Sequence, residues 1–371
     1  MTRKPELAEF ALRRSRAEKA IAALARGEQI IVVDDVNHAE AQGFFVAAAA
    51  QTTSPLMAAM VRYSSGFVCV ALPGDTCDRL DLPAMEGVTP DTDSDMRACV
   101  TVDAIHGTST GISAHDRART AALLADPHAA RDDFTRPGHV VPVRTAAAGL
   151  SACRGIAEAA SFLTEKAGHG PAASFAAAVG GTIETGLPGP AELMAFATAR
   201  RLSLVSISDV HLHMLSTDPV VTRELSTRVL GQEVVTYVGT MPSARFQVLI
   251  TGTPDQCDEV PLYLHSSSQD SRNTDSASDV DVVERSMVTA GRGIVVHVQS
   301  ARPLTRPESP EFSPVPFAVA DILHDVGIRA VCLINGDTEL RTVLQLRDIA
   351  VRNVLRATPA TWESVRALHA S

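Results

Sequence analysis

The stretch Asp133–Arg144 reads DFTRPGHVVPVR, and its apolar run Val140–Val143 predicts a strand. Earlier in the chain, Gln29–Asp35 reads QIIVVDD, where the β-branched run Ile30–Val33 predicts a buried strand that ends at Asp34. Segments with helical spacing lie between such strands at irregular intervals. This alternation favours a layered α+β or α/β domain.

The elements around these two strands follow from the same periodicities, 3.6 residues for a helix and two for a strand. Apolar residues at helical spacing predict helices at Glu6–Arg26, Ala39–Ala50, Pro55–Val61, Glu158–Lys166 and Ala191–Arg200. Short runs of strand-forming residues predict strands at Phe67–Ala71, Ala98–Val102 and Leu202–Ile207.

The sequence pattern changes after about Asp218, where strand-forming runs alternate with long polar or proline-rich stretches. We therefore expect two domains, residues 1–215 and 216–371. The polar run Ser266–Asp279 and the proline-rich run Arg302–Pro316 are typical of loops. The second half predicts strands at Glu233–Val238, Phe246–Ile250, Pro261–Leu264, Gly293–Val298 and Ala330–Ile334, and helices at Phe317–His324, Leu340–Ile349 and Ala360–His369.

Composition and charge exclude several classes of protein. The 371 residues are 45% hydrophobic and 20% charged, which is typical of a globular chain and not of a disordered one. No apolar run reaches the roughly 18–20 residues that cross a bilayer, and we expect no membrane span and no secretory signal. A net charge of -10 argues against a nucleic-acid partner. The six cysteines form no C-x-x-C pair, so we expect reduced thiols and a cytoplasmic location.

Four stretches of the first half carry a family resemblance: Gln29–Asp35, Arg79–Pro83 (RLDLP), Ser109–Thr120 (STGISAHDRART) and Asp133–Arg144. Over roughly residues 5–215 the chain resembles 3,4-dihydroxy-2-butanone 4-phosphate synthase, which converts ribulose 5-phosphate to a four-carbon phosphate and formate. Twelve-residue blocks are far more specific than a short glycine motif. The resemblance implies an α+β synthase fold, a divalent metal, a sugar phosphate substrate and a homodimer with shared active sites.

The second half resembles another enzyme of the same pathway. Leu264–Ser266 (LHS), Gly291–Gly293 (GRG) and Ala320–Leu333 (ADILHDVGIRAVCL) are similar to GTP cyclohydrolase II, so the whole chain resembles the fused two-domain enzyme of riboflavin synthesis. That enzyme holds Zn²⁺ with three closely spaced cysteines after the His-Ser pair. Here no cysteine occurs between Cys257 and Cys332, so we expect neither the zinc site nor cyclohydrolase activity.

The resemblance also predicts that the metal site of the first half has been lost. The family's acidic loop after the Asp-Asp strand end reads HAEAQG here (His38–Gly43), and its metal-binding glutamate falls on Ala39. The histidine that is the second metal ligand falls on Ile156, in GIAEA (Gly155–Ala159). These apolar side chains cannot hold Mg²⁺. We therefore expect no metal cofactor.

Other positions implied by the resemblance are replaced as well. A substrate-contacting aspartate falls on Gly43, a phosphate-contacting threonine on Ala157, a phosphate-binding arginine on Cys153 and a catalytic glutamate on Ala177. His139, in the Arg-Pro-Gly-His block, stays in register.

The candidate catalytic residues are three histidines and one aspartate. His139 and His115 lie in the intact blocks, and with His38 they are candidates for a new imidazole site, because histidine is a natural general base near neutral pH. The alternative is that the blocks build the core and a dimer interface. Asp34 is a candidate for acid–base work, against a solvated strand-end turn.

The candidate substrate-binding residues are Thr110, Arg136, Arg154 and Glu158, with the arginines suited to an anion. The alternative for the arginines is a solvated surface. His211 and His213 alternate as on an extended segment, where a strand end is favoured over a metal site.

Three functions follow from these residues. The first is a repurposed enzyme that acts without metal on a small anionic or sugar-like substrate in a specialised pathway, with His139 as acid or base. The second is a non-catalytic regulatory or scaffolding relative. The third, retained ribulose 5-phosphate lyase activity, needs a metal site that these residues do not offer.

Overall fold

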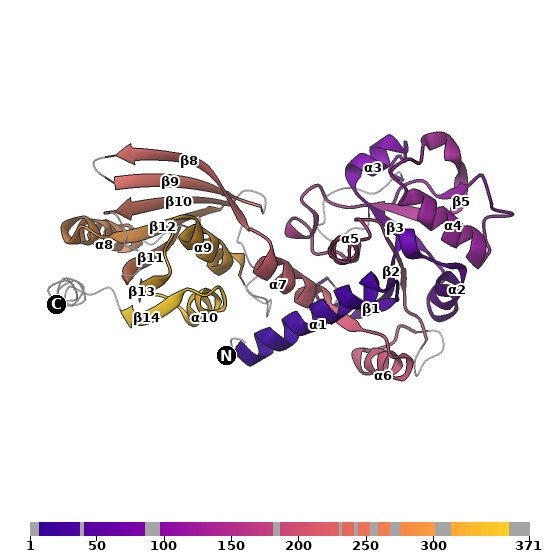
Figure 1. Cartoon of the computed structure of the whole chain (residues 1–371), viewed down its shortest axis with the longest axis horizontal. Coiled ribbons are helices and arrows are strands. Elements are labelled where there is room, and N and C mark those ends of the chain that lie inside the picture. The colour runs from indigo at the N-terminus through magenta and orange to yellow at the C-terminus, as the bar shows by residue number, and fades with distance from the viewer. Residues whose placement is uncertain are drawn as a thin grey trace. The chain divides into compact units, whose positions relative to one another are not determined.

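The computed structural model describes residues 7–37, 41–85, 97–180, 186–229, 232–240, 244–252, 259–267, 275–300 and 313–355. The chain divides into two compact units. One unit contains Glu9–Met214, and the other contains Leu215–Ser371 together with the first eight residues. The expected α+β class is confirmed, because each unit combines helices with one mixed sheet (Figure 1).

In the described part of Glu9–Met214, seven strands form one sheet. In sheet order they are β4 (Val102–Ala104), β5 (Phe134–Arg144), β3 (Cys69–Leu72), β6 (Ala173–Ala177), β2 (Gln42–Ala48), β1 (Ile30–Asp34) and β7 (Leu204–Ser206). β3 runs parallel to β5 and β1 parallel to β7, whereas β2 and β6 pair antiparallel with their neighbours.

The helices of this unit are α1 (Leu7–Ala25), α2 (Ser54–Tyr63), α3 (Gly74–Arg79), α4 (Ala114–Leu124), α5 (Ile156–Lys166), α6 (Pro190–Arg200) and α7 (Ile207–Thr217), with 3₁₀ turns at Ala49–Gln51, Arg131–Asp133 and Gly149–Ser151. Ile31 and Val33 of β1 join one buried cluster that includes residues of α2, α4 and α6. Ile30 and Val32 are equally buried and point to the other face, since side chains alternate along a strand. The sheet is therefore covered on both faces, with α5 packed across β3, β6 and β2.

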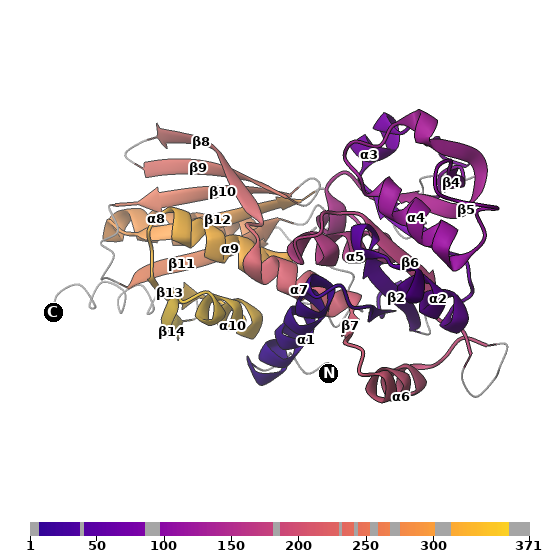
Figure 2. The same ribbon diagram turned by 45° about the vertical axis from the view of Figure 1, so that its right-hand side comes forward.

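In the described part of the second unit, seven strands again form one sheet, which Figure 2 shows across its whole width from β8 to β14. In sheet order they are β14 (Ala350–Leu355), β13 (Ala330–Ile334), β11 (Val260–Ser267), β12 (Gly293–Ser300), β10 (Ala244–Thr251), β9 (Gln232–Gly239) and β8 (Val221–Val229). Three helices connect the parallel strands: α8 (Asp275–Ala290), α9 (Pro314–Asp325) and α10 (Thr338–Leu346). At one edge, β8 is exposed along all its residues after Val221, and among the described strands it pairs only with β9.

Several sequence expectations are wrong. Ala39–Ala50 was expected to be helical, but its described part contains strand β2. This strand lies between β1 and β6 and its residues are mostly buried, so its apolar run lacks the alternation that marks a half-exposed strand. His211 and His213 lie in helix α7 and are buried, so they are not on an extended surface segment. The expected loop Ser266–Asp279 ends in the first turn of α8, and β8 was not foreseen.

Three further expectations fall wholly or mostly outside the described residues: the helix Ala360–His369, the position of His38, and the loop Arg302–Pro316, whose last three residues begin α9. None of the helices in the described ranges is long and apolar enough to cross a membrane.

Candidate active site

His139 is held by a carboxylate that the sequence analysis did not single out. β4 pairs antiparallel with β5, with a register shift between Val102 and Asp103. The Asp103 carboxylate accepts the backbone N–H of His139 at 2.9 Å and lies 2.7 Å from its ring nitrogen Nδ1. The Asp103 side chain is 11% exposed and that of His139 is 41% exposed. The pair therefore has a nearly buried carboxylate and an imidazole that is open to solvent.

Two glycines make this pairing possible. Gly138 passes so close to β4 that an added Cβ would lie 2.0 Å from the carbonyl carbon of Val102. Gly111 has a φ of +85°, and an added Cβ would lie 2.0 Å from Oδ2 of Asp103 and 2.7 Å from Nδ1 of His139. Only glycine fits at these positions, so the Arg-Pro-Gly-His block and the Ser109–Thr120 block meet at one point.

The Ser109–Thr120 block builds the loop that covers Asp103. Asp116 accepts hydrogen bonds from Ser109 Oγ at 2.8 Å and from the Gly111 N–H at 3.1 Å, and these bonds lower the pKa of Asp116. Thr120 accepts the N–H of Ala104, which follows Asp103 in β4. Thr110 is exposed in this loop, between Ser109 and Gly111. The block therefore places Thr110 next to Gly111, the glycine that packs closely against Asp103 and His139.

His115 and Arg136 have partners of their own. His115 is exposed in the first turn of α4, and its Nδ1 lies 3.3 Å from Oγ of Ser54, so its described contact is not with His139. The Arg136 guanidinium donates to the carbonyl oxygens of Leu80, Arg131 and Phe134. These bonds fix the loop before β5, and a role of Arg136 in substrate binding stays a prediction.

A second cluster forms where β1 ends. The buried Asp34 carboxylate accepts the backbone N–H groups of Val36 and Asn37 and the Asn37 side-chain amide. The same amide donates to the carbonyl oxygen of Arg154 at 2.7 Å. The structure thus brings together Asp34 and Arg154, two of the predicted residues, through Asn37. His38 follows directly but lies outside the described residues.

Glu158 belongs to the first turn of α5 and is 4% exposed. Its carboxylate accepts the backbone N–H of Ala146 at 2.9 Å and lies 3.4 Å from the guanidinium of Arg97. Burial and the negative charge of Glu158 raise the pKa of the nearby Cys153 to about 11, so this thiol stays protonated. Glu158 therefore has its charge balanced within the fold, and Arg97 is a contact that the sequence analysis missed.

Among the described residues, Asp34 is not part of a group of side chains that could hold a Mg²⁺ ion. Magnesium needs several oxygen ligands in near-octahedral geometry. Asp34 is bonded to Val36 and Asn37, and the first residue of α5 is Ile156, whose side chain has no donor atom. Across the described ranges, no group of three His, Cys, Asp or Glu side chains is placed to hold a metal ion.

The second unit places two histidines together. His265 of β11 lies opposite His297 of the parallel strand β12, with ring centroids 5.5 Å apart. Nε2 of His297 lies 2.8 Å from a carboxylate oxygen of Glu284 in α8. Burial and the neighbouring imidazole lower the pKa of His265. Cys332 is buried in β13, and burial raises the pKa of its thiol to about 12.

Comparisons with known proteins agree with the resemblance of the first half. The family model described as 3,4-dihydroxy-2-butanone 4-phosphate synthase matches residues 18–213. The riboflavin biosynthesis proteins RibBA of Mycobacterium ulcerans (strain Agy99) and Mycobacterium tuberculosis (strain ATCC 25618 / H37Rv) are each 36% identical over 296 residues, which cover 76% of this chain and 69% of theirs.

Two solved structures are similar to the chain. RibBX, a two-domain 3,4-dihydroxy-2-butanone 4-phosphate synthase from A. baumannii, superposes with a TM-score of 0.73 at 22% identity, covering 91% of this chain and 99% of its own. At that identity the likeness shows the fold alone. A 3,4-dihydroxy-2-butanone 4-phosphate synthase in complex with two magnesium ions has a TM-score of 0.51 at 37% identity, covering 54% of this chain and 97% of its own.

Proposed function

Because the chain belongs to the 3,4-dihydroxy-2-butanone 4-phosphate synthase family, we propose that it is a repurposed member that acts without metal on a small anionic or sugar-like substrate. Its reaction is a proton transfer next to a carbonyl group, the kind of step that the family fold is built to position. The proposal extends to a specialised biosynthetic pathway, a cytoplasmic location and a homodimer.

The Asp103–His139 pair carries this proposal. With Nδ1–H of His139 donated to the Asp103 carboxylate, Nε2 is left with a lone pair to take a proton from substrate. The carboxylate then stabilises the imidazolium that forms, as a buried negative charge 2.7 Å away does. Since the His139 ring is partly exposed, a substrate has access to Nε2.

Substrate binding is assigned to Thr110, Arg136, Arg154 and Glu158. His38, His115 and Asp34 are further candidates for catalytic residues beside His139. The proposed reaction does not use Mg²⁺. The Asp34 carboxylate already accepts hydrogen bonds from the backbone, and Ile156 stands where the family resemblance places a metal ligand. In the second unit we propose that GTP cyclohydrolase II activity is absent, since the sequence has no cysteine between Cys257 and Cys332.

Deuterium exchange tests the proposal directly. The protein is incubated with ribulose 5-phosphate in D₂O, once with Mg²⁺ and once with excess EDTA, and both exchange next to the carbonyl and formate release are followed by NMR. We expect exchange that survives EDTA and no formate. His139→Gln should remove the exchange, whereas His128→Gln, at an exposed histidine, serves as the matched control. Formate release that requires Mg²⁺ would show the retained lyase instead.

One observation favours the non-catalytic alternative. Ser109, Asp116 and Thr120 of the intact block all bond within the protein, so the block has a structural use without any substrate. If no carbonyl compound exchanges its protons while the protein binds an enzyme of riboflavin synthesis, the scaffolding function replaces the catalytic one.

A further inference from the structure

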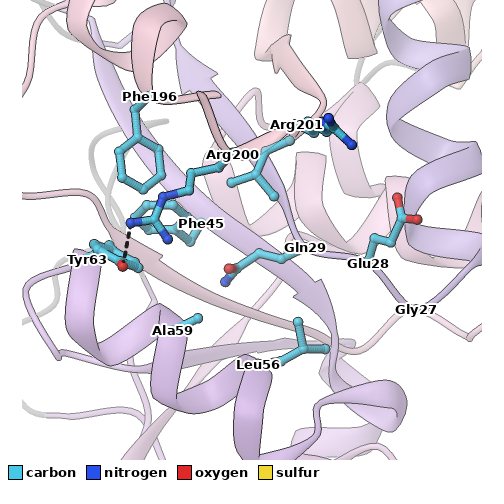
Figure 3. A pocket seen from close by; sticks show the side chains of 11 residues that line it. Gly27, Glu28, Gln29, Phe45, Leu56, Ala59, Tyr63, Phe196, Arg200 and Arg201 are labelled. Atoms are coloured by element: carbon cyan, nitrogen blue, oxygen red, sulfur yellow. Dashed lines mark hydrogen bonds between the residues drawn. The ribbon is translucent and has the colours of Figure 1, made fainter. Parts of the chain in front are cut away.

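A cavity of about 410 Å³ opens at the amino end of β1, whereas Asp34 lies at its carboxyl end. Its walls come from residues 27–29, which precede β1, from β2 and α2, and from the end of α6 with the two residues after it (Figure 3). Phe45, Leu56 and Ala59 supply an apolar wall, and the rings of Tyr63 and Phe196 are packed edge to face with centroids 5.3 Å apart. This volume and this mainly apolar lining with few polar groups are typical of a small-molecule site.

The cavity has an exposed positively charged group, and contacts with two aromatic rings orient this group. The Arg200 guanidinium lies 4.5 Å from the Tyr63 ring centroid and 5.5 Å from that of Phe196, and it donates to the Tyr63 hydroxyl at 2.6 Å. The Tyr63 hydroxyl accepts one of the five N–H groups of Arg200, so other N–H groups of the planar guanidinium can bind an anion. Figure 3 shows this guanidinium between the two rings.

The remaining charges at the rim do not cancel Arg200. Glu28 is the acidic residue of the lining, and both its carboxylate oxygens accept hydrogen bonds from Arg26, at 2.8 and 2.9 Å. Arg201 adds a second positive charge to the lining. The site as a whole therefore favours a negatively charged ligand.

Gln29 supplies a hydrogen-bonding group that the folded chain does not use. It is 6% exposed, and its amide nitrogen is buried and has no hydrogen-bond partner among the residues that the structure describes. In Figure 3 the amide end of Gln29 points along the cavity wall towards Tyr63. A half-turn of the amide exchanges its oxygen and nitrogen, so the group can offer its N–H to an acceptor atom in the cavity.

We propose that this cavity binds a planar heteroaromatic compound that carries a carbonyl group and an anionic substituent, as flavin and purine nucleotides do. The flat ring packs against Phe45, Leu56 and the Tyr63–Phe196 pair, a ring carbonyl accepts from Gln29, and the anion pairs with Arg200. The site is separate from the Asp103–His139 pair and does not depend on the reaction assigned to that pair.

Three probes test the ligand class on the full chain. FMN and GMP combine a flat carbonyl-bearing ring with a phosphate, and riboflavin has the flavin ring without the phosphate. Binding is measured by fluorescence quenching for the flavins and by calorimetry for GMP. We expect FMN or GMP to saturate the site below about 1 mM, the stronger of the two identifying the ring, and riboflavin to bind at least about tenfold more weakly than FMN if the flavin is preferred.

Substitutions locate the site. Gln29→Met keeps the length of the side chain and removes the amide, and Arg200→Gln removes the charge; each should weaken binding of the preferred nucleotide about tenfold. Arg14→Gln, at an exposed arginine of α1 paired with Glu18, should leave binding unchanged. Circular dichroism of each variant confirms that it is folded. The proposal is overturned if neither nucleotide binds, or if both substitutions leave the affinity of the folded protein unchanged.

Discussion

His211 in α7 provides a quantitative prediction about how the stability of the first unit depends on pH. Its imidazole is buried, and burial, together with the positive charges of Arg154 and Arg13, lowers its pKa from 6.5 to about 3. His211 is therefore neutral in the folded protein near neutral pH. As the pH falls below about 6.5, the unfolded chain takes up the proton and the folded chain does not, so stability is lost in this direction.

The size of the effect follows from the two pKa values. Linkage between 6.5 in the unfolded chain and about 3 in the folded chain predicts that the unit loses about 2 kcal/mol of unfolding free energy between about pH 7.5 and about pH 5. His211→Gln places a neutral amide there and removes this contribution. The variant should therefore lose about 2 kcal/mol less than the wild type over the same range, whatever its stability at neutral pH.

Hydrogen exchange followed by mass spectrometry is the suitable measurement, because a chain of two units does not give one unfolding free energy. Peptides covering β1 and β7 report the opening of the sheet next to α7, and their protection is corrected for the intrinsic effect of pH on exchange. The exposed His128→Gln variant should follow the wild type. If the unfolding free energies of the wild type and of His211→Gln change with pH by the same amount, within about 0.5 kcal/mol, the inference that His211 is buried in its neutral form is wrong.

Four further predictions concern the two units. Asp103→Asn keeps the shape of the carboxylate but removes its charge, so proton exchange should fall about tenfold to a hundredfold with little change in KM, as measured by the D₂O assay. Gly111→Ala should cost about 2–4 kcal/mol in thermal or urea unfolding, because the new Cβ collides with Asp103 and the φ of +85° is unfavourable; an equal stability of the two proteins would contradict the described loop. Arg347→Ala should destabilise the second unit by about 3 kcal/mol, since Arg347 bonds to the mostly buried Asp321 and to the Ser216 carbonyl, and the exposed Arg341→Ala is the control. Excess EDTA should shift the melting temperature by less than about 1 °C, and a larger fall in melting temperature would reveal a structural metal.

Local patterns in the sequence predicted most of the described elements of both sheets. The strand Ile30–Val33, the helix Glu158–Lys166 and the strand Ala330–Ile334 correspond to β1, α5 and β13. β2 was mistaken for a helix because an apolar run buried on both faces fits both periods. β8 was missed because the exposed sequence that follows Val221 gives no apolar signal, and the strand depends on its pairing with β9.

The candidate site was less predictable than the fold. His139 was found through the Arg-Pro-Gly-His block, but Asp103 lies in a stretch with no motif, 36 residues away. Their contact depends on the shifted register of β4 and β5, which is a long-range property that no local spacing encodes. The two glycines at Gly111 and Gly138 were the available signal, because both lie inside the recognised blocks at points of close approach.

The edge strand β8 has a consequence for how the protein behaves at high concentration. Within the described ranges no strand pairs with the outer side of its nine residues, so this row of backbone groups could pair with the same edge of a second molecule. Arg223 forms an ion pair with Glu233, and Glu224 forms one with Arg245. Charged side chains therefore lie along the exposed edge. Exchange of these side chains for apolar ones would remove the charges from this edge and would favour aggregation through sheet extension.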